Sequence, residues 1–166
     1  MKDITKTLSL NDNTDYGLCF ACGPRNSSGL QLLFERDGDR VTTTYQAMER
    51  HQGFPGYLHG GTISTLLDEA MSRVSLLDNR WTITARMEVK FKHPIRICDR
   101  VKVVAEKLRE TRGFLETRGW VEQADGNVVA EASGKFVFLS EEYLMRMSSE
   151  YPGLADEWGM GVDPRN

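Results

Sequence analysis

One stretch of this sequence has the spacing of an α-helix, and it stands between segments that have the spacing of β-strands. From Gly60 to about Leu77, apolar residues recur three and four positions apart, which places them on one face of a helix. These residues are Ile63, Leu66, Leu67, Ala70, Met71, Val74 and Leu77. Nearly every turn presents a large apolar side chain, so we expect a buried core helix.

Strand patterns lie on both sides of this helix. Before it, residues 30–36 and 41–45 flank the turn sequence Asp37-Gly38-Asp39 and predict a β-hairpin. After Trp81, apolar and polar residues alternate as far as residue 92, and Pro94 ends this strand. Turn residues separate three further expected strands, at residues 100–108, 114–123 and 128–139. The last segment is compatible with a short helix at residues 141–148. We expect the four strands after the core helix to form an antiparallel meander.

This element order predicts an α+β fold in which a curved antiparallel sheet wraps around one long helix. With so few helices, the sheet can cover its apolar face only by curling around the core helix, and we expect its other face to meet a second subunit. A chain of 166 residues is one domain of ordinary size. We place this domain at residues 19–139, after an N-terminal lead-in at 1–18 and before a C-terminal extension at 140–166.

Composition and charge exclude several classes of partner. The formal net charge of −3 provides no basic surface for nucleic acid or an anionic membrane. No apolar run approaches the roughly 20 residues of a membrane-spanning helix, and the first residues lack the apolar segment of a secretory signal. Three cysteines are too few for a disulfide framework. We therefore expect a cytoplasmic protein with neither a nucleic-acid nor a membrane partner.

The start of the core helix is the segment most suited to chemistry. Gly60 and Gly61 let another group approach the backbone closely, and the free N–H groups of a helix N-terminus, aided by the helix dipole, form an anion or oxyanion site. A carboxylate two turns further on can act on a carbonyl polarised there. Asp68 and Glu69 flank the apolar stripe at similar angles on opposite sides, so spacing alone leaves the choice between them open.

Several motifs together resemble the hotdog-fold acyl-CoA thioesterases of the phenylacetate-pathway (PaaI) type. The central one is His59-Gly60-Gly61 followed by Leu67-Asp68. The resemblance covers residues 19–139 and also includes Cys19-Phe20-Ala21-Cys22-Gly23, Gln52-Gly53-Phe54-Pro55-Gly56, Thr84-Ala85, Val89, Phe91 and Pro94. That family wraps an antiparallel sheet around one long helix, which is the element order expected here.

The resemblance implies a catalytic role for three residues. Asp68, nine residues after the histidine, corresponds to the family's catalytic carboxylate and would act as general base or nucleophile. The backbone amide of Gly60 would polarise the thioester carbonyl, and Thr84 would help to place the water or the carboxylate. The alternation puts Thr84 on the polar face of its strand. Since such sites form between subunits of a homodimer or homotetramer, Thr84 is expected to serve the neighbour's Asp68.

Substrate contacts are expected from the residues around the helix start, and no metal or other cofactor is implied. The expected substrate-binding residues are His59, Gly61, Gln52, Phe54 and Tyr57, with Phe54 and Tyr57 in the acyl pocket. For His59, a structural hydrogen bond is an alternative to direct contact with the substrate. The expected activity is hydrolysis of acyl-CoA to free acid and CoA.

One departure from the family keeps other functions open. Many members carry Asn or Gln six residues before the histidine, where it holds the nucleophilic water, whereas this chain has Gly53. Gln52 is a substitute candidate for that role. A non-catalytic acyl-CoA or small-ligand binding protein on the same fold is therefore the main alternative. A hotdog hydroxyacyl-thioester dehydratase is a further one, although the His and carboxylate arrangement of such enzymes is not found.

Two other groups of residues have more than one interpretation. Cys19 and Cys22 form a CxxC motif, which can be half of a zinc site, a redox pair or part of an entry loop that packs across the acyl or CoA end of the site. We favour packing, because no second cysteine pair is present. Basic residues can hold the phosphates of a nucleotide carrier or simply form a solvated strand face; they are Arg86, Lys90, Lys92, Arg96 and Lys135.

Overall fold

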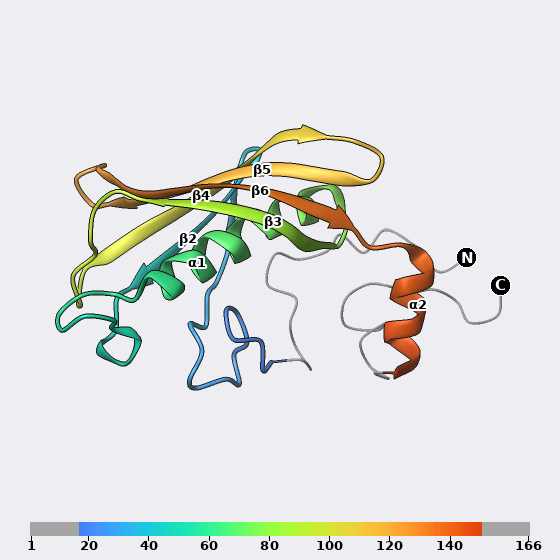
Figure 1. Ribbon diagram of the computed structural model, residues 1–166. Coiled ribbons are helices and arrows are strands. Elements are labelled where there is room, and N and C mark those ends of the chain that lie inside the picture. Colours follow the sequence, from blue (N-terminus) through green and yellow to red (C-terminus); the bar gives the residue numbers. More distant parts are fainter. Residues whose placement is uncertain (1–16, 151–166) are drawn as a thin grey trace.

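A six-stranded antiparallel sheet dominates the computed structural model, which describes residues 17–150. The strands lie in the order β1-β2-β4-β5-β6-β3. They are β1 (Glu35–Asp37), β2 (Arg40–Gln46), β3 (Thr82–Phe91), β4 (Arg100–Glu110), β5 (Phe114–Gln123) and β6 (Val128–Phe138). Helix α1 (Gly60–Arg73) lies along one face of the sheet (Figure 1) and continues as the 3-10 helix η2 (Val74–Asp78). The predicted sheet around one long helix is confirmed.

The hydrophobic core lies between α1 and the inner face of the sheet. Leu66, Leu67 and Met71 on the helix are fully buried, which confirms the apolar stripe. Gly119 on β5 lies directly beneath them, because a Cβ atom on it would approach Met71 Cγ to 3.0 Å and Leu67 Cδ2 to 3.4 Å. The missing side chain at Gly119 lets the helix pack close to the sheet.

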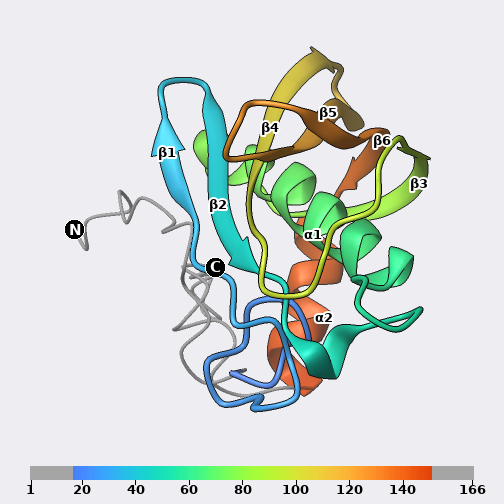
Figure 2. The same cartoon turned by 90° about the vertical axis from the view of Figure 1, so that its left-hand side faces the viewer.

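The predicted four-strand meander is wrong in its first step. Strands β4, β5 and β6 do form a meander, but β3 pairs with β6 at the sheet edge, and β4 pairs with β2. The connection from β3 to β4 crosses in front of α1 in Figure 2. Its Ile95 is fully buried and its carbonyl accepts from the Leu58 amide at 2.9 Å. This anchored crossover, rather than a tight turn, carries the chain to the far side of the helix.

The first predicted strand is also shorter than expected. The hairpin between β1 and β2 is confirmed, but the ladder begins only at Glu35, whereas the prediction began at residue 30. Gln31 has a positive φ of 50°, which interrupts an extended strand. Leu30, Leu32 and Phe34 are buried nonetheless. Their alternation therefore reflects burial against the core and not pairing with β2.

A β-bulge in β3 changes which face each residue occupies. The pairing with β6 runs in register from Phe91 to Arg86, then skips Ala85 and resumes at Thr84, which pairs with Phe136. An extra residue reverses the inside-outside alternation beyond it. The prediction that placed Thr84 on the polar face is therefore wrong: Thr84 faces α1, and Ile83, expected inside, is about half exposed.

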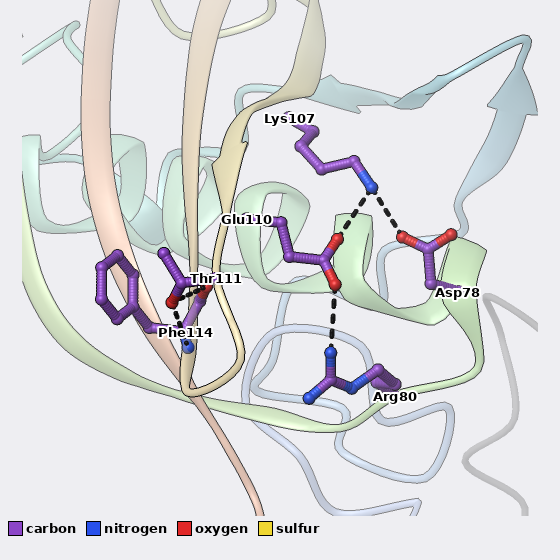
Figure 3. Close-up of polar contacts among 6 residues, drawn as sticks. All are labelled: Asp78, Arg80, Lys107, Glu110, Thr111 and Phe114. Carbon is purple, nitrogen blue, oxygen red and sulfur yellow. Dashed lines mark hydrogen bonds and ion pairs between the residues drawn. The ribbon is translucent and has the colours of Figure 1, made fainter.

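An ion-pair network ties the end of η2 to β4. Figure 3 shows Lys107 between the carboxylates of Asp78 and Glu110, with Nζ–O distances of 2.8 and 2.9 Å, and Arg80 bound to Glu110 at 3.0 Å. The same view shows Thr111, whose hydroxyl bonds the backbone of Phe114 in the turn to β5. These half-exposed pairs individually contribute little stability, and they connect the end of η2 to β4.

The C-terminal extension begins as a helix. Helix α2 (Glu141–Glu150) confirms the short helix predicted at 141–148. Residues 1–16 of the predicted lead-in and residues 151–166 of the extension lie outside the described part of the chain. Among residues 17–150, each helix is too short or too polar to cross a membrane.

Candidate active site

The N-terminus of α1 is capped by a side chain and leaves one backbone amide unpaired. His59 is the N-cap, and its Nδ1 accepts from the Gly61 amide at 2.8 Å. Nδ1 is therefore unprotonated, and the ring N–H lies at Nε2. Within residues 17–150, no group accepts from the amide of Gly60. This donor, together with the positive end of the helix dipole, is available to an incoming oxygen.

The two glycines serve different purposes. A Cβ atom on Gly61 would lie 2.8 Å from His59 Nδ1, so the cap requires a residue without a side chain there. A Cβ atom on Gly60 would meet only the Phe91 ring, at 3.6 Å, which is ordinary contact. Phe91 is about half exposed and forms one wall beside the Gly60 amide.

Asp68 lies two turns further along α1 and faces β3. Its Oδ1 accepts a 2.7 Å hydrogen bond from the Thr84 hydroxyl. Burial raises the pKa of the Asp68 carboxyl, the hydrogen bond from Thr84 opposes this increase, and the nearby charge of Glu69 adds to it. A partly desolvated carboxylate held by one hydroxyl is suited to take a proton or attack a carbonyl.

The Thr84–Asp68 contact corrects one expectation. The resemblance implies that Thr84 serves the Asp68 of a neighbouring subunit, but the hydrogen bond joins two residues of the same chain. The physical reason is the bulge at Ala85, which turns Thr84 toward the helix of its own chain.

Glu69 is separated from Asp68 by its surroundings. The Glu69 carboxylate forms an ion pair with Arg73 one turn on, at 2.8 Å, on the side of α1 that faces the Cys19–Cys22 loop. In the described part of the chain, Asp68 has no such cationic partner. Tertiary contacts thus assign the two acids to different tasks, a choice that helical spacing left open.

The loop before α1 holds the remaining expected residues. The Gln52 side chain accepts from the Gly56 amide at 3.2 Å and so shapes a turn. Phe54 and Tyr57 are exposed, Phe54 by 84%. A Cβ atom on Gly53 would lie 3.2 Å from His59 Cα, so this position touches the cap directly.

A buried pair that sequence reasoning missed supports the cap from below. Tyr45 Oη and His51 Nδ1 lie 2.5 Å apart, and the His51 carbonyl accepts from the His59 amide at 2.9 Å. Burial lowers the pKa of His51 and raises that of Tyr45. The sequence pattern indicates only a loop residue at His51. The sequence feature that could have indicated this pair is Tyr45, whose hydroxyl needs a partner because Tyr45 shares the buried face of its strand with Val41 and Thr43.

The distance along the helix limits how the two groups can cooperate. Asp68 follows Gly60 by eight residues, so at a rise of about 1.5 Å per residue the two lie about 12 Å apart along the α1 axis. A single carbonyl group spans far less than this. Gly60 and Asp68 of the same chain therefore cannot act on one carbonyl.

Several of the basic side chains considered as phosphate ligands already contact neighbouring acidic or aromatic groups. Lys92 pairs with Glu131 at 2.7 Å, and Lys135 lies over the Phe114 ring at 3.8 Å. Arg86 lies 3.7 Å from Glu88 with most of its side chain in solvent. These contacts favour a solvated outer face over a preformed phosphate site.

Cys19, Cys22 and Glu69 form a cluster whose sulfur and oxygen atoms lie within 4.8 Å of one another. Among the described residues this is the one group with the composition of a metal site. The guanidinium of Arg73 also belongs to it, at 2.9 Å from Cys22 Sγ and 2.8 Å from Glu69. A positive charge in this position opposes the binding of a metal cation.

Comparison with known proteins finds thioesterases among the proteins that are similar to this chain. Residues 55–130 match the thioesterase superfamily. The acyl-coenzyme A thioesterase THEM4 of Bos taurus is 28% identical over 128 residues, which cover 74% of this chain and 52% of the bovine protein. The chain spans about half the length of the curated relatives that it matches.

Solved structures show the same arrangement of helix and sheet. The E. coli PaaI protein from the phenylacetic acid degradation operon has a TM-score of 0.63 and 15% identity, and the match covers 67% of this chain and 81% of that one. A hypothetical thioesterase from Streptococcus pneumoniae, solved with coenzyme A, has a TM-score of 0.62 and 17% identity, with 66% of this chain and 86% of that one covered.

Proposed function

We propose that this chain is a hotdog-fold member of the thioesterase superfamily and that it hydrolyses acyl-CoA thioesters to the free acid and CoA. The observation that carries the proposal is the pairing of an unoccupied amide at Gly60 with a partly buried carboxylate at Asp68 that Thr84 holds. The name of the bovine relative and the coenzyme A in the pneumococcal structure support this choice of substrate.

In the proposed reaction, the Gly60 amide donates to the thioester carbonyl oxygen. Its hydrogen bond and the helix dipole stabilise the negative charge that develops there. Asp68 either takes a proton from the attacking water or attacks the carbonyl carbon itself, and Thr84 holds its carboxylate in place. The carbon–sulfur bond then breaks, and CoA leaves as the thiol after protonation. If water attacks, the acid forms directly; if Asp68 attacks, an acyl–Asp68 anhydride forms and water then hydrolyses it to release the acid and restore the carboxylate.

We propose that this site forms between two copies of the chain. The separation of about 12 Å along α1 means that the Gly60 of one copy must work with the Asp68 of the other. Two α1 helices lying antiparallel would create two such sites related by a two-fold axis. His59 and Gly61 would border the carbonyl, and the exposed Phe54 and Tyr57 would line the acyl group.

Strand β3 is the element best placed to join the copies in a homodimer. It is ten residues long and lies at the sheet edge, so within residues 17–150 one side of its backbone pairs with no other strand. It also carries Thr84, which donates a hydrogen bond to Asp68, and Phe91, which lies beside Gly60. Antiparallel pairing of two β3 strands would extend the sheet across the dimer and bring the two helices together. A homotetramer would then pair two such dimers.

The proposal is tested by measuring thiol release from short, medium, long and aromatic acyl-CoA thioesters. We expect turnover of at least one class and a decrease in kcat/KM of about 10²–10⁴-fold in Asp68→Asn. Glu69→Gln on the neighbouring position is the matched control and should retain most activity. Unchanged kcat/KM in Asp68→Asn on the best substrate would contradict the assignment.

A non-catalytic acyl-CoA binding protein is the second candidate, and Gly53 favours it. The family's water-holding amide is absent at that position, and Gln52 Oε1 is occupied by the Gly56 amide. Binding of acyl-CoA without thiol release from any member of the panel would support this alternative. Thiol release that depends on Asp68 would exclude it.

A further inference from the structure

The CxxC motif is held in a rigid turn that the thioesterase chemistry does not use. Gly23 makes this turn possible, because a Cβ atom on it would lie 2.5 Å from the Cys19 nitrogen and 2.6 Å from the Cys19 oxygen. The Gly23 amide donates to the Cys19 carbonyl at 2.9 Å and closes the turn around the two cysteines. Their sulfur atoms lie within 4.8 Å of each other, so the two thiols are neighbours in the folded chain.

The two thiols differ in accessibility and in acidity. Cys19 is partly exposed, whereas Cys22 is buried. The Cys22 thiol donates to the Cys19 sulfur, and the amides of Cys22 and Ala21 also point toward it. These donors together lower the pKa of Cys19 to about 6, although burial and the charge of Glu69 oppose them. Cys19 is thus the more accessible and the more acidic thiol of the pair, which are the properties of an attacking nucleophile.

Cys22 has the properties of a resolving thiol. Its hydrogen bond to Cys19, burial and the charge of Glu69 raise its pKa, so it holds its proton until Cys19 has reacted. Arg73 lies 2.9 Å from its sulfur and can stabilise the charge that forms when the proton leaves. Glu69, within hydrogen-bond reach of the Cys22 thiol, can accept that proton.

The surroundings give a small ligand access to the pair. A hollow of about 280 Å³ is lined by both cysteines, by Glu69 and Arg73 from α1, and by Tyr143 from α2. Among the described residues that line this hollow, the charged groups are one acid and one base, Glu69 and Arg73, which pair with each other. This arrangement favours a reactive dithiol over a metal site, because the guanidinium of Arg73 occupies the place of a cation.

We propose that Cys19 and Cys22 form a redox-active dithiol that exchanges with low-molecular-weight disulfides. The Cys19 thiolate attacks one sulfur of the disulfide, forms a mixed disulfide and releases one thiolate, which takes a proton from solvent. Cys22 then transfers its proton to Glu69 and attacks the Cys19 sulfur, and the second thiol leaves with a proton. Two protein thiols are oxidised to one disulfide, and one small disulfide is reduced to two thiols. This chemistry does not depend on the proposed thioester hydrolysis.

The test exposes the reduced chain of 166 residues to oxidised glutathione at neutral pH, followed by acid quenching and mass spectrometry. We expect the peptide that contains both Cys19 and Cys22 to lose two hydrogen atoms, with no lasting glutathione adduct. In Cys22→Ser the reaction should stop at a glutathione adduct on Cys19, and in Cys19→Ser the disulfide should be absent. In Glu69→Gln the mixed disulfide should persist more than tenfold longer.

Two controls separate exchange at this pair from oxidation at Cys98 and from loss of the folded structure. Cys98→Ser removes the remaining, exposed cysteine and should leave the oxidation of the pair unchanged. Thermal melting of Cys19→Ser and Cys22→Ser verifies that both variants are folded. Reduced Cys19 and Cys22 after prolonged exposure to oxidised glutathione would overturn the proposal. One equivalent of bound zinc that is lost in Cys22→Ser would also overturn it, because it would identify a structural metal site.

Discussion

Asp68 and Glu69 are adjacent acids on α1 with different surroundings. Glu69 is neutralised by Arg73, whereas Asp68 is partly buried against β3 and accepts a hydrogen bond from Thr84. Burial raises the pKa of the Asp68 carboxyl, and Thr84 holds this carboxylate on the side of α1 that faces β3. At the scale of the residue, the environment and not the residue type distinguishes the candidate catalytic acid.

The role of the Gly60 amide can be tested without disturbing the helix. In Gly60→Pro the N–H is lost, and proline is well tolerated at the first position of a helix, particularly after His59 with its extended ψ of 137°. If the amide polarises the thioester, kcat should fall about 10²–10³-fold while the melting temperature stays close to that of the wild type.

Gly60→Ala is the matched control, because it retains the amide and its Cβ meets Phe91 at an ordinary distance. Equal activity in the alanine and proline variants would show that the N–H is not used.

The hydrogen bond from Thr84 should be visible in the pH dependence of hydrolysis. It lowers the pKa of Asp68 against the effect of burial. Removing it in Thr84→Val should raise that pKa further. Since only the ionised carboxylate can act as base or nucleophile, the acid limb of the kcat/KM profile should shift to higher pH. Thr84→Ser keeps the hydroxyl and should keep the wild-type profile; an unshifted limb in the valine variant would contradict the role of Thr84.

At the scale of the elements, the packing of α1 on the sheet depends on a glycine in β5. Gly119→Ala would place a methyl group 3.0 Å from Met71 and 3.2 Å from the Val104 carbonyl oxygen, both of which lie in a filled core. We expect a loss of about 1–3 kcal/mol in the free energy of unfolding. Urea denaturation measures this loss. Gly113→Ala, in a turn with open space around it, is the control and should have a much smaller effect.

The bulge in β3 is the other feature that operates at this scale. Strand periodicity predicted the strand correctly but placed Thr84 on the wrong face. One unpaired residue, Ala85, reverses the alternation and turns the hydroxyl toward Asp68. Period-two alternation carries no mark of where a bulge falls, because the position of the extra residue depends on the pairing with β6.

At the scale of the whole molecule, the separation of Gly60 and Asp68 predicts that activity belongs to a pair of chains. Coexpression of Gly60→Pro and Asp68→Asn chains should produce mixed pairs with one intact site and one doubly defective site. Random pairing should restore about a quarter of the wild-type activity, although each variant alone is nearly inactive. Light scattering measures the mass of the assembly. No restoration in verified mixed assemblies would indicate a site within one chain.

The local pattern of the sequence determined the kinds of elements and the residues that α1 buries. It also identified the Gly60–Gly61 helix start, since periodicity and capping act between near neighbours. Tertiary structure decided the order of the strands, the side of β3 that carries Thr84 and the different partners of Asp68 and Glu69. These features depend on contacts between segments far apart in the chain, such as β3 with β6 and Ile95 with Leu58, whose geometry no local repeat encodes.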